Sequence, residues 1–180
     1  TMRFGRHVDM TVSRAYHLAL SCVLATHAGD TALAQQFTDV AERAGIGYQH
    51  SGFMYIGGIA IADFDDDGFQ DIYVTTGEGH PNLFYLNDQD GTFAERASTS
   101  RIADMSEGWG AVAGDLDNDG DPDIYLTNYF SENQLFLNDG GGRFVTAVES
   151  GASDPGPSTS AALADYNNDG RLDIYVLNRS

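Results

Sequence analysis

Three short acidic segments contain the residues of this chain that could do chemistry. Each follows the pattern Asp-x-Asp/Asn-x-Asp-Gly-x-x-Asp, and they occupy residues 63–71, 115–123 and 165–173. Carboxylates placed this close together repel one another unless a cation lies among them. Calcium takes about six to eight oxygen ligands at flexible distances, whereas magnesium requires a rigid octahedron. The pattern therefore favours calcium binding.

The spacing within each segment indicates which atoms face the ion. Side chains at the first, third, fifth and ninth positions converge as the chain curls, and glycine at the sixth position permits the sharp turn. The backbone carbonyl at the seventh position can add a ligand. We expect up to three Ca²⁺ sites, of which the third is the weakest because asparagine supplies no charge. The predicted ligands are Asp63, Asp65, Asp67, Asp71 and the Phe69 carbonyl; Asp115, Asp117, Asp119, Asp123 and the Asp121 carbonyl; and Asp165, Asn167, Asp169, Asp173 and the Arg171 carbonyl.

Acidic segments of this kind also occur in ordinary turns and in EF-hands. A single Asp-Asn-Gly string is also typical of an ordinary turn, but three copies in register, each with an aspartate at the ninth position, favour a metal site. An EF-hand needs a glutamate at the twelfth position and flanking helices. Val74, Leu126 and Val176 stand at that position here. The EF-hand interpretation is therefore excluded.

Short apolar stretches flank the acidic segments and position them. Stretches of this kind, bounded by Gly, Asn and Asp, are typical of β-strands, and no long helical period follows residue 50. The recurring stretches are residues 59–62, 111–114 and 161–164 before the segments; residues 72–74, 124–126 and 174–176 after them; NLFYLND and NQLFLND at 82–88 and 133–139; and strands that begin at Phe93 and Phe144.

The stretches recur with a period that suits a β-propeller blade. The first aspartates of the acidic segments are 52 and 50 residues apart, and about 50 residues form one four-stranded blade. We predict an all-β fold of four-stranded antiparallel units, with repeats at about 52–102, 103–153 and a truncated 154–180.

The start of the repeat region and the number of blades lead to two further expectations. Residues 36–46 resemble residues 93–102, which predicts an incoming outer strand. About two and a half blades fall short of the roughly 4 to 8 that close a ring. We therefore expect a partial ring, that is, a fragment of a longer protein. The alternative is an open stack of blades, which would leave strand edges exposed.

The N-terminal segment has the pattern of an export signal. Arg3, Arg6 and Arg14 precede the apolar residues 15–25, and small residues follow at 32–34. We predict a signal peptide over residues 1–34 and the propeller repeats over residues 35–180. The apolar run is too short for a transmembrane segment. A short N-terminal helix is the alternative.

Composition narrows the classes of partner. The formal net charge is −18, with nine arginines, no lysine and 27 acidic residues. Nucleic-acid binding depends on cations that meet phosphates, so nucleic acid is excluded as a partner. The one cysteine, Cys22, supplies no disulfide framework. These features suit a protein that is secreted or lies at the cell surface or in the periplasm.

The acidic segments and their surroundings resemble FG-GAP/VCBS repeats, as in the propeller of integrin α-subunits. The stretches FTDVAERAGI, EGWGAVAGDLDNDGDPDIYLTNY and NQLFLNDGGGRF are most similar to the cartilage acidic protein family, which is often associated with a C-terminal ASPIC/UnbV domain. The similarity covers about residues 36–180. It implies a secreted or surface-exposed propeller with calcium in its loops.

No catalytic set stands out in the sequence. His50 and His80 are the histidines after residue 34, and both lie in turn-like stretches. Ser51 and Ser106 lack a nucleophile-elbow context, and Trp109 is expected to pack between blades. We therefore expect no catalytic residues and a binding or adhesion module for an extracellular protein or glycan. The alternative is part of an extracellular calcium-dependent enzyme, such as a polysaccharide lyase, with its catalytic residues outside this chain.

Overall fold

The computed structural model describes residues 37–47, 57–77 and 79–179, and these residues form an all-β structure. The predicted fold class is confirmed. The predicted signal peptide, His50 and Ser51 lie outside the described residues. Within them, no helix is long and apolar enough to cross a membrane. The strands are β1 (Ile59–Ala62), β2 (Asp71–Val74), β3 (Leu83–Asn87), β4 (Phe93–Glu95), β5 (Gly108–Gly114), β6 (Asp123–Asn128), β7 (Gln134–Asn138), β8 (Phe144–Thr146), β9 (Ser158–Ala164) and β10 (Asp173–Asn178).

The strands form three antiparallel sheets that repeat one register. The orders are β1-β2-β3-β4, β5-β6-β7-β8 and β10-β9. Tyr73 pairs with Ala60, Tyr125 with Val112, and Tyr175 with Ala162, which is the same offset in each sheet. A one-residue slip would move every side chain to the opposite face, so the shared register places equivalent residues on equivalent faces.

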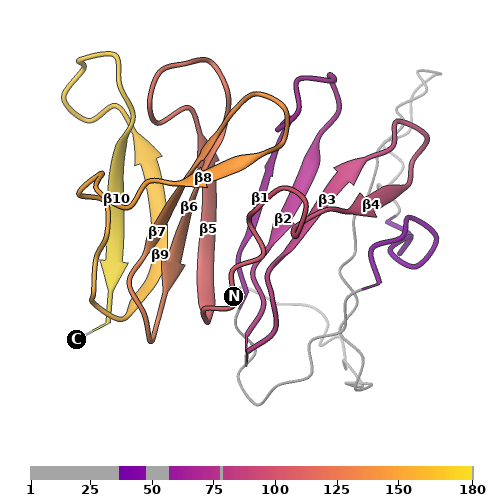
Figure 1. Cartoon of the computed structure of the whole chain (residues 1–180), viewed down its shortest axis with the longest axis horizontal. Helices are drawn as coiled ribbons and strands as arrows, with labels where there is room; N and C mark the ends of the chain where they lie inside the picture. The colour runs from indigo at the N-terminus through magenta and orange to yellow at the C-terminus, as the bar shows by residue number, and fades with distance from the viewer. Residues whose placement is uncertain (1–36, 48–56, 78, 180) are drawn as a thin grey trace, which may run out of the picture.

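The sheets stand side by side, and the first strand of each packs on the first strand of the next. β1 contacts β5, and β5 contacts β9. Figure 1 shows that the connections β1–β2, β5–β6 and β9–β10 all lie at the same end of the molecule. These connections are the three acidic segments, here called the acidic loops (residues 63–71, 115–123 and 165–173). The sheets therefore bring the acidic loops together along one edge.

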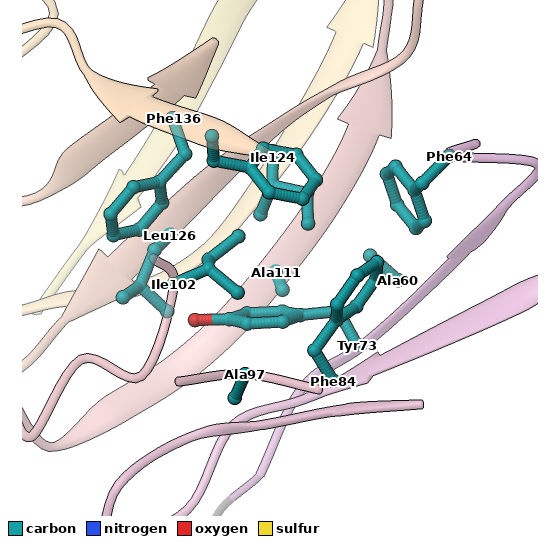
Figure 2. Packing of buried hydrophobic residues seen from close by; sticks show 11 residues of the cluster. Ala60, Phe64, Tyr73, Phe84, Ala97, Ile102, Ala111, Ile124, Leu126 and Phe136 are labelled. Atoms are coloured by element: carbon teal, nitrogen blue, oxygen red, sulfur yellow. The ribbon is translucent and has the colours of Figure 1, made fainter. Parts of the chain in front are cut away.

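The main hydrophobic core lies between the first two sheets. Figure 2 shows side chains from β1–β3, such as Tyr73, facing Ile124 and Leu126 of β6. Ala97 and Ile102, from the connection between the sheets, belong to the same cluster. The packing of one sheet therefore depends on its neighbour.

Three phenylalanine rings join the first acidic loop to this core. Phe64, the second residue of the loop, meets Phe84 of β3 at a ring-centroid distance of 5.5 Å and Phe144 of β8 at 5.7 Å. The Phe84 and Phe144 rings are 5.5 Å apart, and all three pairs are edge-to-face. This is the arrangement that aromatic pairs prefer. It fixes the first acidic loop to the hydrophobic core.

Residues 41–45 form a turn, and no strand occurs in residues 37–46, which corrects the prediction of an outer strand there. The Ile46 N–H donates to the Ala41 carbonyl at 2.9 Å, and Gly45 has a φ of 78°. A left-handed residue and a local hydrogen bond of this kind end an extended strand. The resemblance to residues 93–102 lies in this turn, since Ile102 bonds to Ala97 in the same way at 3.0 Å.

Each of these turns hydrogen-bonds to the fourth strand of a sheet. The Phe93 N–H donates to the Ala44 carbonyl at 2.9 Å, and the Phe144 N–H donates to the Ser100 carbonyl at 3.0 Å. The second bond joins two sheets. Ser100 belongs to the turn that follows the first sheet, and Phe144 is the first residue of β8, the last strand of the second sheet. The turn therefore links consecutive sheets in addition to the side-chain core.

The second loop position offers a matched test of this core. We expect Phe64→Ala to lower the free energy of unfolding by about 3–5 kcal/mol, because a fully buried aromatic ring is lost. Tyr166 occupies the same loop position but is 89% exposed, so Tyr166→Ala should cost within about 0.5 kcal/mol. Urea denaturation measures both, with Phe64→Leu as a milder variant. Equal losses at the two positions would contradict the assignment of the core.

Candidate metal centre

The first acidic loop brings three carboxylates to one point. Asp63, Asp65 and Asp71 each offer one oxygen, and these oxygens all lie within 4.8 Å of one another. Asp63 shapes the loop, because its two oxygens accept from the N–H groups of Asp67 at 3.1 Å and Gly68 at 2.8 Å. The loop residues before the ninth position thus curl around the first aspartate.

The second acidic loop repeats this arrangement. One oxygen each of Asp115, Asp117 and Asp123 falls within the same 4.8 Å limit. The Asp115 oxygens accept from the N–H groups of Asp119 and Gly120, both at 3.1 Å. The first, third and ninth predicted positions therefore converge in both loops, and either group could hold a metal ion.

The aspartate at the ninth position also has a structural role that sequence reasoning missed. Asp71 accepts from the Phe64 N–H at 2.9 Å with Oδ2 and from the Asn87 N–H at 2.8 Å with Oδ1. Asp123 makes the corresponding bonds at 2.8 Å and 2.9 Å to the second loop residue and to the end of β7. The sequence signal for this role is the asparagine before the last residue of NLFYLND and NQLFLND, which recurs in both stretches. A carboxylate has about four lone-pair sites, so these bonds leave room for a cation.

The ionised form of the first-loop carboxylates is unfavourable without a counter-ion. Burial, together with the smaller effect of the charges of Asp65 and Asp67, raises the pKa of Asp71 to about 6, although the hydrogen bonds that it accepts act in the opposite direction. Burial also raises the pKa of Asp65, as does the charge of Asp67. Asp65 Oδ1 is buried and has no hydrogen-bond partner among the described residues. A buried acceptor without a partner is costly, and a divalent cation among the three oxygens would relieve both problems.

The second loop shows the same electrostatic pattern. Burial raises the pKa of Asp123, with a smaller contribution from the charge of Asp117. Desolvation and the charge of Asp119 raise the pKa of Asp117. Oxygen-only donors with several negative charges are the ligands that calcium prefers. The residues present therefore fit a divalent cation in the first two loops.

The carboxylates at the fifth position lie outside these groups of three. Asp67 accepts from the Phe69 N–H at 2.8 Å and from Gln89 Nε2 at 2.9 Å. Asp119 accepts from the Asp121 N–H at 3.0 Å. In this structure the fifth position shapes the turn. Its role as a ligand remains a prediction, as does that of the carbonyls of Phe69, Asp121 and Arg171.

The third acidic loop keeps the backbone pattern with fewer charges. Asp165 accepts from the N–H groups of Asp169 at 3.1 Å and Gly170 at 3.0 Å, as in the other loops. Asn167 stands at the third position and donates from Nδ2 to Asp169 Oδ2 at 3.1 Å. Asp173 accepts from the second loop residue at 2.9 Å. The loop therefore offers carboxylates at its first and ninth positions with an amide between them, and its lower affinity remains a prediction.

The acidic loops are close enough to influence one another. Asn118 of the second loop donates from Nδ2 to the Gly170 carbonyl of the third at 3.3 Å. Desolvation raises the pKa of Asp121, and the charges of Asp119 and of Asp66 in the first loop raise it further. The end of the molecule at the top of Figure 1 is therefore a continuous acidic edge.

The remaining candidates from the sequence do not join a site. Ser106 Oγ accepts from Gln134 Nε2 at 3.2 Å, and the His80 carbonyl accepts from the Thr76 hydroxyl at 2.6 Å. Trp109 of β5 stacks on Tyr129, the residue after β6, with ring centroids 3.9 Å apart, and its packing between blades remains a prediction. In the described ranges, none of these hydrogen bonds joins a serine to a histidine.

Comparison with known proteins points to one family. The model of the FG-GAP-like repeat family matches residues 63–126 and 115–176, so each match runs from one acidic loop through the next. The chain is similar to cartilage acidic protein 1 of Xenopus tropicalis, with 31% identity over 125 residues, and to that of Mus musculus, with 29% identity over 133 residues. Each alignment covers 67% of this chain but only 19% and 21% of those proteins. The chain thus spans about a fifth of the length of these relatives. The resemblance stated from the sequence is confirmed.

The raised pKa of Asp71 predicts how stability depends on pH. Folded Asp71 keeps its proton up to about pH 6, whereas the ordinary pKa is 3.8. The folded state binds more protons between these values, so in chelator the free energy of unfolding should fall as the pH rises from about 4 to about 6. Calcium should offset this loss, because it neutralises the ionised carboxylates. Urea denaturation across this range, with calcium and with chelator, measures the difference. Parallel curves would contradict the prediction.

Proposed function

Because this chain belongs to the FG-GAP-like repeat family, we propose that it is a secreted, calcium-binding β-propeller domain that acts as a binding or adhesion module. The observation that carries the proposal is the convergence of three carboxylates in each of two loops, one of them with an unpaired buried oxygen. Asp63, Asp65 and Asp71 would hold one ion. Asp115, Asp117 and Asp123 would hold a second, and the third loop offers a weaker site.

The geometry suggests what calcium contributes to such a module. When bound, the ion supplies the positive charge that the clustered carboxylates lack. In the first two loops the ninth aspartate already ties its loop to the third strand of the sheet, and Asn138 Nδ2 of β7 donates to the Phe64 carbonyl of the first loop at 2.8 Å. An ion that holds the loop closed would therefore also stiffen the contact between neighbouring sheets. Calcium thus acts as a structural ion in this proposal.

The proposed location rests on sequence features. The N-terminal residues 1–34 have the pattern of an export signal, and the net charge of −18 without lysine suits an extracellular protein. A lone cysteine leaves calcium, rather than disulfides, to strengthen the fold. These features support secretion or display at the cell surface.

The proposed partner is an extracellular protein or a glycan. Stiff loops gathered on one edge of a rigid scaffold are where binding residues usually lie. The polysaccharide lyase alternative needs a base and a substrate site, and nothing in the described ranges favours it over binding. The binding module is therefore the function that the arrangement supports best.

Calcium dependence of stability tests the proposal. Ions that bind only the folded state add RT ln(1 + [L]/Kd), about 2.7 kcal/mol per site at 100 times Kd. The protein should therefore melt at a higher temperature in millimolar calcium than in chelator, and magnesium should substitute poorly. Asp65→Asn and Asp117→Asn should each reduce the calcium-dependent gain by removing a ligand charge.

The matched control is Asp66→Asn in the first loop. Asp66 is exposed and lies outside the group of three carboxylates. Its φ is 57°, close to the 65° of Asn118 and the 59° of Asn168 at the same position of the other loops, so asparagine fits there. This variant removes the same charge and should keep the calcium-dependent gain. A melting temperature that is indifferent to chelator, or equal effects of Asp66→Asn and Asp65→Asn, would contradict the proposal.

A further inference from the structure

One hairpin lies between the first and second acidic loops. It is the linking hairpin (residues 138–142), which joins β7 to β8 and is drawn in orange near the top of Figure 1. A Cβ placed on Gly142 would lie 3.5 Å from Asp65 Cβ in the first loop, and one on Gly140 would lie 2.5 Å from Asp121 Oδ2 in the second. Both glycines have positive φ values, 65° and 80°, which glycine adopts without strain. Glycine therefore lets the linking hairpin lie close to both loops.

Asn138, the first residue of the linking hairpin, hydrogen-bonds to both loops. Its Nδ2 donates to the Phe64 carbonyl of the first loop at 2.8 Å and to the Pro122 carbonyl of the second at 3.1 Å. Its N–H donates to Asp123 Oδ1 of the second loop at 2.9 Å. Asn138 is only 4% exposed, so water does not compete freely for these bonds. One buried residue thus joins the two loops.

The groups that this asparagine holds are next to the proposed calcium ligands or are ligands themselves. Phe64 stands between Asp63 and Asp65, two of the three converging carboxylates of the first loop. Asp123 is one of the three in the second loop. The Phe64 carbonyl also accepts from the Gly142 N–H at 2.9 Å, so the linking hairpin holds it twice. A shift of the first loop is therefore transmitted to a ligand of the second.

Asn87 occupies the equivalent position in the first sheet and supplies a matched comparison. Its N–H donates to Asp71 Oδ1 at 2.8 Å, and its Nδ2 donates to the Gln70 carbonyl at 3.2 Å. These bonds correspond to those that Asn138 makes to its own loop. In the part of the chain that the structure describes, Asn87 makes no bond to a second acidic loop. A change at Asn87 therefore removes the bonds within one sheet and leaves the link between the first two loops in place.

We propose that Asn138 couples the first two acidic loops, so that calcium bound in one loop raises the calcium affinity of the other. The inference rests on the proposed calcium sites and adds a regulatory link between them. An ion that orders one loop fixes the linking hairpin, so the second ion has less conformational freedom left to remove. Charge acts in the opposite direction, because an ion in one loop repels a second ion nearby. An increase in affinity therefore identifies the structural link.

The test is a calcium titration of the whole chain, followed by NMR at the Gly68 amide of the first loop and the Gly120 amide of the second. Asp117→Ala removes a ligand of the second site and should weaken calcium binding at Gly68 by about 5-fold, the lower end of typical couplings. Coupling is reciprocal, so Asp65→Ala should weaken binding at Gly120 by the same factor. Asp121→Ala removes the same charge as Asp117→Ala, but from a side chain outside the three carboxylates, and so measures the effect of charge alone.

Asn138→Ala identifies the residue that carries the coupling. It removes the side chain that reaches Phe64 and keeps the backbone N–H that holds Asp123. In this background, Asp117→Ala should change binding at Gly68 no more than the charge control does. Asn138→Leu, which keeps the side-chain volume without a donor, should give the same result if the alanine variant does not fold. Asn87→Ala is the matched control and should retain the 5-fold coupling.

The outcomes separate this inference from the calcium sites on which it rests. If both loops bind calcium but Asp117→Ala and Asp121→Ala affect Gly68 equally, the loops are independent and the inference is overturned. A 5-fold coupling that persists in the folded Asn138 variants also overturns it, because another contact then carries the coupling. If neither Gly68 nor Gly120 responds to calcium, the proposed calcium sites are wrong and the inference fails with them.

Discussion

In each of the two four-stranded sheets, the aspartate at the end of the acidic loop joins three parts of the sheet by hydrogen bonds. Asp71 opens β2, and its two oxygens bind the start of the loop at 2.9 Å and the end of β3 at 2.8 Å. It is fully buried, and burial raises its pKa to about 6. The fold thus places an anionic group where ionisation is costly, and the nearby Asp63 and Asp65 add negative charge. A cation in the loop would offset this cost, so the proposed metal binding would depend on the geometry of the loop.

The same loop also depends on the next sheet. The Phe64 carbonyl accepts from Asn138 Nδ2 at 2.8 Å and from the Gly142 N–H at 2.9 Å, both on the hairpin that joins β7 to β8. The Phe64 ring meets Phe144 across the boundary between the sheets. A change in the first loop would therefore alter its contacts with the neighbouring sheet. The repeated sheets stabilise one another, as in other repeat architectures.

Local pattern was enough to predict the strands, the loops and the repeat, because each depends on residues close together in sequence. The convergence of Asp63 and Asp65 followed from their spacing. The hydrogen bond from Asn87 to Asp71 spans 16 residues, and that from Asn138 to Phe64 spans 74, so neither could be deduced from the loop pattern alone. A strand was predicted at residues 37–46 because they resemble residues 93–102, yet the structural feature that the two segments have in common is a turn.

The central claim is that the converging carboxylates of the first two acidic loops are calcium ligands. A crystal structure grown in millimolar calcium, with anomalous scattering to identify the ion, tests this most directly. The account predicts one ion about 2.3–2.6 Å from oxygens of Asp63, Asp65 and Asp71, and another at the same distances from Asp115, Asp117 and Asp123. Loops that keep their present hydrogen bonds at saturating calcium, with no anomalous signal among those oxygens, would contradict it.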